Sequence, residues 1–93
     1  MTVPEIREIV IQGICEIQTL SGRPEHIITD NTVPLQDLPD FDSVNAEEVT
    51  ARILATLQID LGSREHLFFE GNKLKTVGDV VANICELTGV EGA

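Results

Sequence analysis

The chain has 93 residues, of which 42% are hydrophobic and only three are aromatic, so a single small domain must build its core mainly from aliphatic side chains. Sixteen acidic against six basic residues give a formal charge of -10, which repels nucleic acid and anionic membranes and favours cationic protein partners. No apolar run approaches the roughly 20 residues that span a bilayer, and no signal peptide is recognisable. We therefore expect one soluble, cytoplasmic, monomeric domain over residues 1–93, with no nucleic-acid binding and no membrane insertion.

The two cysteines, Cys15 and Cys85, lie far apart and form no CxxC pair, and no histidine accompanies them at a metal-ligand spacing. We expect two reduced structural thiols and no metal site. An EF-hand loop started at Asp37 also fails, because Asp42 stands where that loop requires glycine.

The first predicted helix covers residues 4–20. Apolar residues recur there at spacings of three and four, which is typical of one buried helical face. Thr2 and Glu5 can form a capping box at its start, and Gly22 with Pro24 ends it. The expected buried stripe consists of Ile6, Ile9, Val10, Gly13, Ile17 and Leu20.

A long connection follows over residues 21–42. It contains three prolines and shows no lasting periodicity, so we expect a surface loop without regular structure. Loops of this length inside a small domain are often functional. The apolar residues expected to hold it against the core are Ile27, Ile28, Val33, Leu35 and Leu38.

The second main helix is predicted to begin at Asp42 or Ser43, both of which are good N-cap residue types, and to end near Gln58. Its buried face continues from Val44 or Ala46 at its head. The further members of that face are Val49, Ile53 and Leu57.

Two more helices complete the prediction. A short one is expected over residues 63–71, and the last begins after Thr76, which can form a capping box with Asp79, and ends before Gly89. Its expected buried stripe consists of Val77, Val80, Val81, Ile84 and Leu87. No segment shows the alternation typical of a strand.

Residues 40–44, Asp-Phe-Asp-Ser-Val, resemble the Asp-Ser-Leu site of acyl carrier proteins. In that family the serine hydroxyl is esterified by 4′-phosphopantetheine, whose thiol carries an acyl group. Residues 75–81, Lys-Thr-Val-Gly-Asp-Val-Val, are similar to the Thr-Val-Gly-Asp stretch before the final helix of the same family. Two such motifs within the same order of helices cover most of the chain, which makes the resemblance more specific than either motif alone.

The resemblance implies an all-α, acyl-carrier-like four-helix bundle, with three main helices, one short helix and a long loop between helices one and two. It implies that Ser43 carries a covalent 4′-phosphopantetheine and that Asp42 supports the modification by helping the transferase bind its metal. A phosphodiester at this position would also lie at the positive end of a helix dipole. The chain would then be no enzyme, but a carrier that presents acyl thioesters to fatty-acid, polyketide or related specialised enzymes.

The resemblance also implies a partner surface. Val44, where many relatives have leucine, would contact partners at the head of the helix, and Glu47 and Glu48 would face basic docking patches on the phosphopantetheinyl transferase and on acyl-loading and synthase enzymes. Two departures from the family pattern indicate a dedicated set of partners: residues 38–43 replace the usual Gly-x-Asp-Ser approach, and the second half of the helix lacks the common acidic cluster and adds the positive charge of Arg52. Glu47 also stands where the family often has an apolar residue, which leaves open which residues dock a synthase.

Other functions remain open at this stage. A peptidyl or aminoacyl carrier is the nearest variant. The alternative from a different class is an unmodified acidic helical interaction module, in which Ser43 only caps its helix. A serine hydrolase lacks a recognisable base, because no motif links His26 or His66 to a serine.

Overall fold

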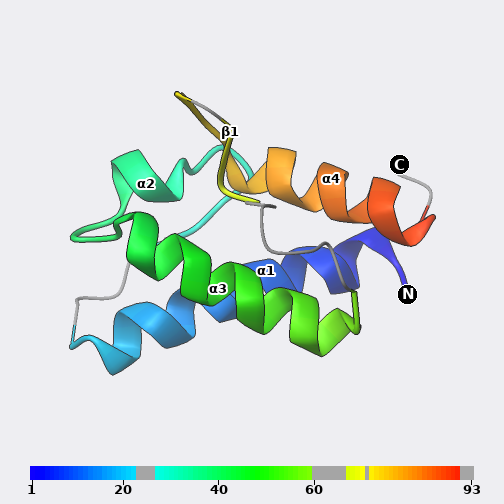
Figure 1. Ribbon diagram of the computed structural model, residues 1–93, viewed down its shortest axis with the longest axis horizontal. Coiled ribbons are helices and arrows are strands. Elements are labelled where there is room, and N and C mark those ends of the chain that lie inside the picture. The colour runs from blue at the N-terminus through cyan, green and yellow to red at the C-terminus, as the bar shows by residue number, and fades with distance from the viewer. Residues whose placement is uncertain (23–26, 60–66, 71, 91–93) are drawn as a thin grey trace.

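The computed structural model describes residues 1–22, 27–59, 67–70 and 72–90, and these ranges contain four helices (Figure 1). The helices are α1 (Val3–Leu20), α2 (Pro34–Asp37), α3 (Ser43–Leu57) and α4 (Val77–Thr88). Two short strands, β1 (Phe69–Glu70) and β2 (Lys73–Leu74), pair antiparallel, with Phe69 opposite Leu74 and Glu70 opposite Lys73. The described part of the chain is therefore mostly helical, as predicted, with one small hairpin that was not.

All three long helices begin with a capping box, in which two side chains satisfy backbone N–H groups that the first turn leaves unpaired. Two of these boxes were predicted, and their presence confirms both helix starts. The third was missed because its last residue is asparagine instead of the usual glutamate or glutamine. The three pairs are Thr2 with Glu5, Asp42 with Asn45, and Thr76 with Asp79.

Helix α1 is the central element, because it packs against both α3 and α4 (Figure 1). Gly13 makes the contact with α3 close: a Cβ atom added at Gly13 would lie 3.3 Å from Cγ1 of Val49 and 3.7 Å from Cγ1 of Ile53. The glycine that weakens α1 as an isolated helix thus lets the two helices approach.

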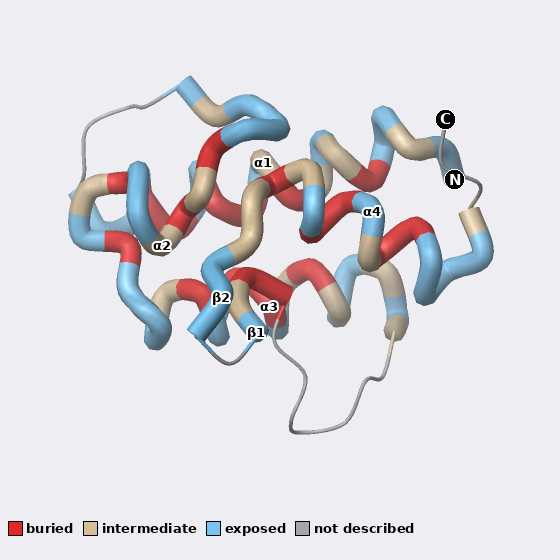
Figure 2. Tube along the Cα trace, turned by 90° about the horizontal axis from the view of Figure 1, so that it is seen from above, coloured by how far each residue is buried: buried red, intermediate tan, exposed pale blue. Residues whose placement is uncertain are grey.

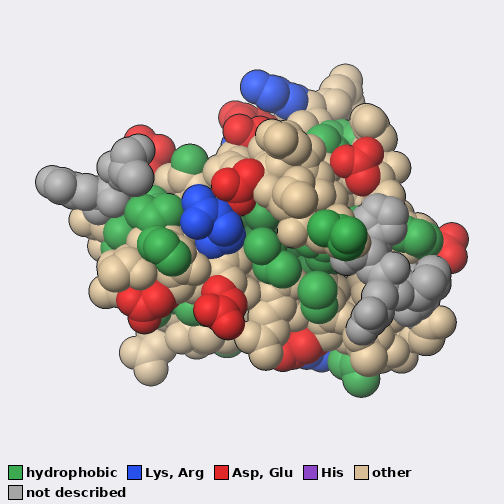
Figure 3. All heavy atoms as spheres, turned by 180° about the vertical axis from the view of Figure 1, so that it is seen from behind, with side chains coloured by type: hydrophobic (Ala, Val, Ile, Leu, Met, Phe, Trp, Pro, Cys, Tyr) green, Lys and Arg blue, Asp and Glu red, His purple; other side chains and the backbone are tan. Residues whose placement is uncertain are grey.

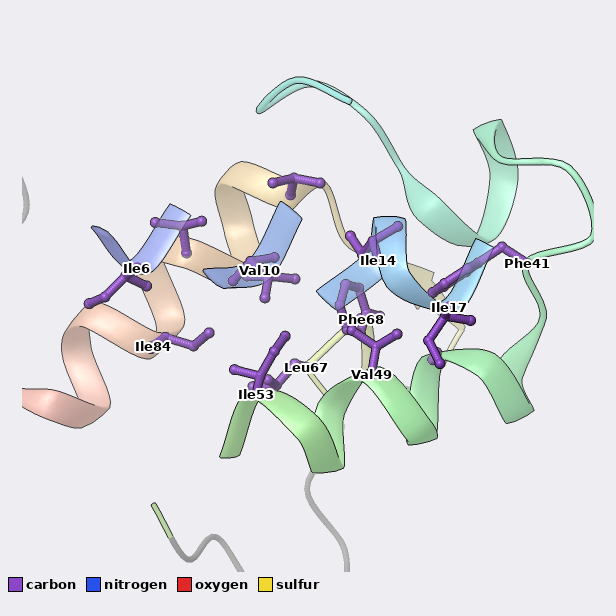
Figure 4. Close-up of a cluster of buried hydrophobic side chains, with 14 of the residues drawn as sticks. Ile6, Val10, Ile14, Ile17, Phe41, Val49, Ile53, Leu67, Phe68 and Ile84 are labelled. Atoms are coloured by element: carbon purple, nitrogen blue, oxygen red, sulfur yellow. The ribbon is translucent and has the colours of Figure 1, made fainter. Parts of the chain in front are cut away.

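The core lies where the three long helices meet, and the buried segments of the chain turn toward one another (Figure 2). It is mainly aliphatic, as the composition predicts, but two of the three phenylalanines are inside it. Phe41 and Phe68 pack edge to face, with ring centroids 6.0 Å apart and an interplanar angle of 66°. In Figure 4, Phe68 lies among aliphatic side chains of α1 and α3, and Phe41 lies beside Ile17.

Several predicted core positions are wrong. Leu20, Leu87 and Ile27 are 72%, 45% and 86% exposed. The two leucines lie in the last turns of their helices, where the apolar spacing continues but no neighbour within the described residues covers it. Ile14, which the predicted stripe omitted, is fully buried instead.

The predicted short helix over residues 63–71 is also wrong at its described end. Its first residues and Gly71 lie outside the described residues, but Phe69 and Glu70 form β1. The buried side chain of Phe68 fixes the chain there, and its carbonyl accepts a hydrogen bond from the N–H of Lys75 at 3.0 Å. That bond closes the hairpin and excludes a helical continuation.

The long loop contains regular structure that was not predicted. Helix α2 begins with Pro34, whose missing N–H costs nothing at a first helical position. The Asp37 carboxylate accepts a hydrogen bond from the N–H of Val33 at 2.7 Å, which closes this single turn. Leu38, immediately after it, is buried and holds the loop against the core as predicted.

The same loop completes the start of α4. The N–H groups of Val77 and Gly78 donate to the carbonyls of Thr32 and Asp30, at 2.8 and 2.9 Å. A Cβ atom at Gly78 would lie only 3.2 Å from the Asp30 carbonyl oxygen. Glycine at this position therefore lets the loop satisfy two of the unpaired N–H groups of α4.

The surface seen from behind in Figure 3 mixes hydrophobic and charged side chains, with acidic residues scattered over it. No helix within the described ranges is long and apolar enough to cross a membrane. Cys15 is exposed and Cys85 is buried, and the two do not form a disulfide.

We predict that Gly78→Ala destabilises the domain by about 1 kcal/mol, because the added methyl group displaces the Asp30 carbonyl and weakens both loop-to-helix hydrogen bonds. Urea denaturation followed by circular dichroism measures the difference. Because alanine is the better helix former, an increase in stability would show that helix propensity outweighs the loop contact.

Candidate functional site

Ser43 is the first residue of α3, and Asp42 is its N-cap. Oδ1 of Asp42 accepts hydrogen bonds from the N–H groups of Val44 and Asn45, both at 3.0 Å. Oδ1 of Asn45 accepts in return from the N–H of Asp42 at 3.3 Å. Of the two N-cap candidates that the sequence left open, the structure therefore selects Asp42, and the hydroxyl of Ser43 is not needed for capping.

The Ser43 side chain is exposed, and its hydroxyl makes no hydrogen bond among the described residues. Both histidines lie outside the described residues. In the part of the chain that the structure describes, no three His, Cys, Asp or Glu side chains are grouped to hold a metal ion. What the geometry offers is an accessible primary alcohol on a rigid helix start.

The buried side chain of Phe41 anchors the segment before Ser43 in the core. The Phe41 side chain is 3% exposed, whereas Asp40, Asp42 and Ser43 around it are exposed. Its edge-to-face contact with Phe68 and its position beside Ile17 fix it between α1 and the hairpin segment (Figure 4). Burial of this one side chain therefore directs its neighbours toward the surface.

A second anchor comes from α1. The amide Nε2 of Gln18 donates to the carbonyl of Pro39 at 3.0 Å, and the Gln18 residue is only 5% exposed. A buried amide needs such a partner, because leaving it unsatisfied costs about 1–3 kcal/mol. Gln18 thus ties the loop before Ser43 to the central helix. It follows Ile14 by one helical turn on the buried face, and because the predicted stripe omitted Ile14, the prediction missed Gln18 as well.

The backbone turns sharply between these two anchors. Asp40 has a φ of 55°, in the left-handed region that glycine adopts most easily. Aspartate tolerates this region better than most other residues, because its short side chain makes local hydrogen bonds. The turn brings the chain from buried Leu38 to buried Phe41, with half-buried Pro39 and exposed Asp40 between them.

The outer face of α3 carries the predicted partner-contact residues. Val44 is 67% exposed, and Glu47 and Glu48 are exposed beside it. Ala46, not Val44, therefore completes the core at the head of the helix. The buried residues of α3 are Ala46, Val49, Thr50 and Ile53.

The two glutamates differ in their contacts. Oε1 of Glu48 lies 3.4 Å from Nη2 of Arg52, one turn further along α3. Nη1 of the same arginine lies 3.3 Å from Oε2 of Glu16 on α1. No ion pair of Glu47 is found within the described ranges. The sequence showed that Arg52 adds a positive charge, but not that it bridges two helices.

Comparisons with protein-family models, curated proteins and solved structures found no match for this chain. Its functional interpretation therefore rests on the sequence motif and on the geometry around Ser43. That geometry separates two roles: Asp42 stabilises the helix, and Ser43 presents an exposed hydroxyl.

We predict that Ser43→Ala changes the free energy of unfolding by less than about 0.5 kcal/mol, whereas Asp42→Ala lowers it by about 1 kcal/mol through loss of the cap. Urea denaturation of both variants beside the wild type makes the comparison. A loss in Ser43→Ala as large as that in Asp42→Ala would mean that the serine contributes to capping after all.

The left-handed backbone at Asp40 gives a second prediction. Asp40→Gly and Asp40→Ala remove the same carboxylate, but only alanine keeps a Cβ atom in the strained conformation. We expect the glycine variant to be more stable than the alanine variant by about 1 kcal/mol. Equal stability of the two variants in thermal and urea denaturation would mean that residue 40 does not adopt a left-handed backbone conformation in solution.

Proposed function

We propose that this protein is an acyl carrier protein and that Ser43 is the attachment residue for 4′-phosphopantetheine. One observation carries the proposal: within the Asp-Ser-Val motif, Asp42 alone caps α3, so the exposed Ser43 hydroxyl remains for modification. When attached, the group supplies a terminal thiol that holds an acyl chain as a thioester. The protein contributes the position of that arm and the surface that partners recognise.

The fold is consistent with the carrier-like bundle that we propose. A central α1 packs against α3 and α4, and a long loop leads from α1 to the serine. The glycine of the usual Gly-x-Asp-Ser pattern corresponds to Asp40, which has a left-handed backbone. The departure from the family pattern therefore places aspartate at a position whose left-handed backbone glycine adopts most easily.

Asp42 has a free oxygen for a second role. Its Oδ1 atom accepts both capping hydrogen bonds, and Oδ2 accepts none among the described residues. The carboxylate can therefore cap α3 and still offer Oδ2 to the metal ion of a phosphopantetheinyl transferase. Capping and assistance to the modification do not compete for the same atom.

Fewer backbone N–H groups are available to bind a phosphate on Ser43 than the sequence suggested. The N–H groups of Val44 and Asn45 already donate to Asp42. Of the first three N–H groups of α3, only that of Ser43 itself is left to bind a phosphate. The negative charge of the Asp42 carboxylate also partly neutralises the positive end of the helix dipole, which weakens its attraction for a phosphate. We therefore propose an arm that is fixed by its covalent bond and extends freely into solvent, as a shuttle requires.

The exposed head of α3 is the proposed partner surface. Val44 offers an apolar contact, and Glu47 offers a carboxylate without an ion pair in the described chain. Such exposed charges add little affinity but set orientation and association rate with basic partners. The partners proposed are the transferase and the acyl-loading and synthase enzymes. An unmodified interaction module would use the same surface, so modification of Ser43 decides between them.

We predict that incubation with coenzyme A and a broad-specificity phosphopantetheinyl transferase adds one phosphopantetheine to the wild type and none to Ser43→Ala. Intact-mass spectrometry measures both. Because Ser43→Ala should keep its stability, its failure to gain mass would reflect the missing hydroxyl and not unfolding. A folded wild type that stays unmodified would favour the interaction module.

Asp42→Asn is the matched variant for the second role of Asp42. Asparagine caps helices as well as aspartate does, so the variant should retain its stability. Loss of the carboxylate should slow modification at least about ten-fold, because the ligand for the transferase metal is removed. An unchanged rate would restrict Asp42 to capping.

A further inference from the structure

Gln18 is the only buried side-chain amide among the described residues, and it lies on the face of α1 that packs into the core. Glutamine is seldom buried, because its amide gives up hydrogen bonds to water that an apolar side chain never makes. A leucine or a methionine would fill the same position without that cost. Glutamine differs from them in the hydrogen bond that its amide donates to the connection between α1 and α3.

That hydrogen bond reaches the chain immediately before its left-handed turn. Nε2 of Gln18 lies 3.0 Å from the carbonyl oxygen of Pro39, and the next residue, Asp40, has a φ of 55°. A residue other than glycine relaxes from this region toward negative φ unless the structure around it prevents the change. Gln18 holds the residue before the turn, and the buried ring of Phe41 holds the residue after it. Asp40 is therefore kept at positive φ from both sides.

The direction of this turn is transmitted to Ser43 through the cap of α3. Only two residues separate Asp40 from Ser43. The N–H of Asp42 donates to Oδ1 of Asn45 at 3.3 Å, the longest of the three hydrogen bonds of this capping box. A change of φ at Asp40 redirects that N–H first, and with it the backbone that presents the Ser43 hydroxyl. The rest of α3 is held independently, by its close packing against α1 at Gly13.

We propose that Gln18 is a positioning residue for the modification of Ser43: by holding the turn at Asp40, its amide sets the orientation in which the serine hydroxyl meets coenzyme A. The inference rests on the proposed carrier function. In that modification the serine oxygen attacks the phosphorus that bears the pantetheine group, and a new O–P bond forms. The diphosphate O–P bond breaks, adenosine 3′,5′-bisphosphate leaves, and the hydroxyl proton passes to a base of the transferase. The rate of such a displacement depends on the direction of attack.

Docking and chemistry respond differently to the loss of this hydrogen bond. The outer face of α3, with Val44 and Glu47, is fixed by the helix itself, so the affinity for the transferase should not change. The turn before Ser43 loses its fixed direction, so the chemical step should slow. A side chain that only stabilised the fold would change neither quantity at a temperature where the protein stays folded.

The test compares Gln18→Met with Thr32→Val. Methionine is close to glutamine in length and fits buried sites, but it cannot donate to Pro39. Thr32 is 8% exposed and Gln18 5%, and the Thr32 hydroxyl accepts a hydrogen bond from the N–H of Thr29 at 2.9 Å. Thr32→Val therefore removes a hydrogen bond between a buried side chain and the backbone of the same connection, at the end that contacts α4. It controls for lost stability.

Modification is followed by intact mass in single turnovers, with coenzyme A saturating and the broad-specificity phosphopantetheinyl transferase in excess. Gln18→Met should lower the rate constant at saturating transferase about five-fold and leave the half-saturating transferase concentration unchanged. Thr32→Val should match the wild type in both quantities. Glycine adopts positive φ about as readily as negative φ, so Gln18→Met should slow modification less than about two-fold in an Asp40→Gly background.

A rate constant of Gln18→Met equal to that of the wild type, or an equal loss in Thr32→Val, would overturn the inference. An undiminished loss in the Asp40→Gly background would overturn it as well, because the amide would then act by a route other than the turn. The carrier function is judged separately, by the mass gain of the wild type. A folded wild type that gains no mass would remove the carrier function and the role of Gln18 together.

Discussion

Burial of Phe41 is the constraint on which the geometry around Ser43 depends. The side chain enters the core between α1 and Phe68, one residue before the cap of α3. Exposed residues flank it on both sides, so the buried ring sets the direction in which Asp42 and Ser43 leave the core. Gln18 on α1 holds the preceding turn through its hydrogen bond to the Pro39 carbonyl. The connection from α1 to α3 thus ends in a fixed point, which is what a site on a helix terminus requires for reproducible presentation.

Under the proposed function, folding and chemistry are separated between adjacent residues. Asp42 satisfies two backbone N–H groups that α3 would otherwise leave unpaired, and Ser43 takes no part in that bonding. If the serine had been the cap, any group attached to its oxygen would have removed the cap and weakened the helix. With aspartate in that role, a modification of Ser43 leaves the start of α3 intact. The same helix can therefore exist in an unmodified and a modified form with one backbone structure.

The sequence predicted many features that depend on local chemistry, although not the Asp42–Asn45 capping box or α2, and it missed most of those that depend on distant partners. The caps at Thr2 and Thr76 were found because each motif lies within four residues. The bond from Gln18 to Pro39 and the contact of Phe41 with Phe68 join distant segments, so neither follows from periodicity. The exposed ends of the apolar stripes, at Leu20 and Leu87, were missed for the same reason: spacing identifies a face but not how far a neighbour covers it. The position of Ser43 at the start of α3 was predictable; its release from capping was not, because Asp42 and Ser43 are both good caps.

The buried and exposed positions of α3 alternate in a way that leaves its outer face free to change. Ala46, Val49 and Ile53 are in the core, and Gly13 allows α1 to approach the last two of these closely. Val44 and Glu47 are exposed and lie outside that contact, so substitutions at these positions alter charge and apolar area without opening a cavity. Recognition on this face can therefore be adjusted at little cost to stability, whereas the inner face is constrained by close packing. Under the proposed function, this separation allows one small helical framework to be directed to a particular set of enzymes by a few surface charges.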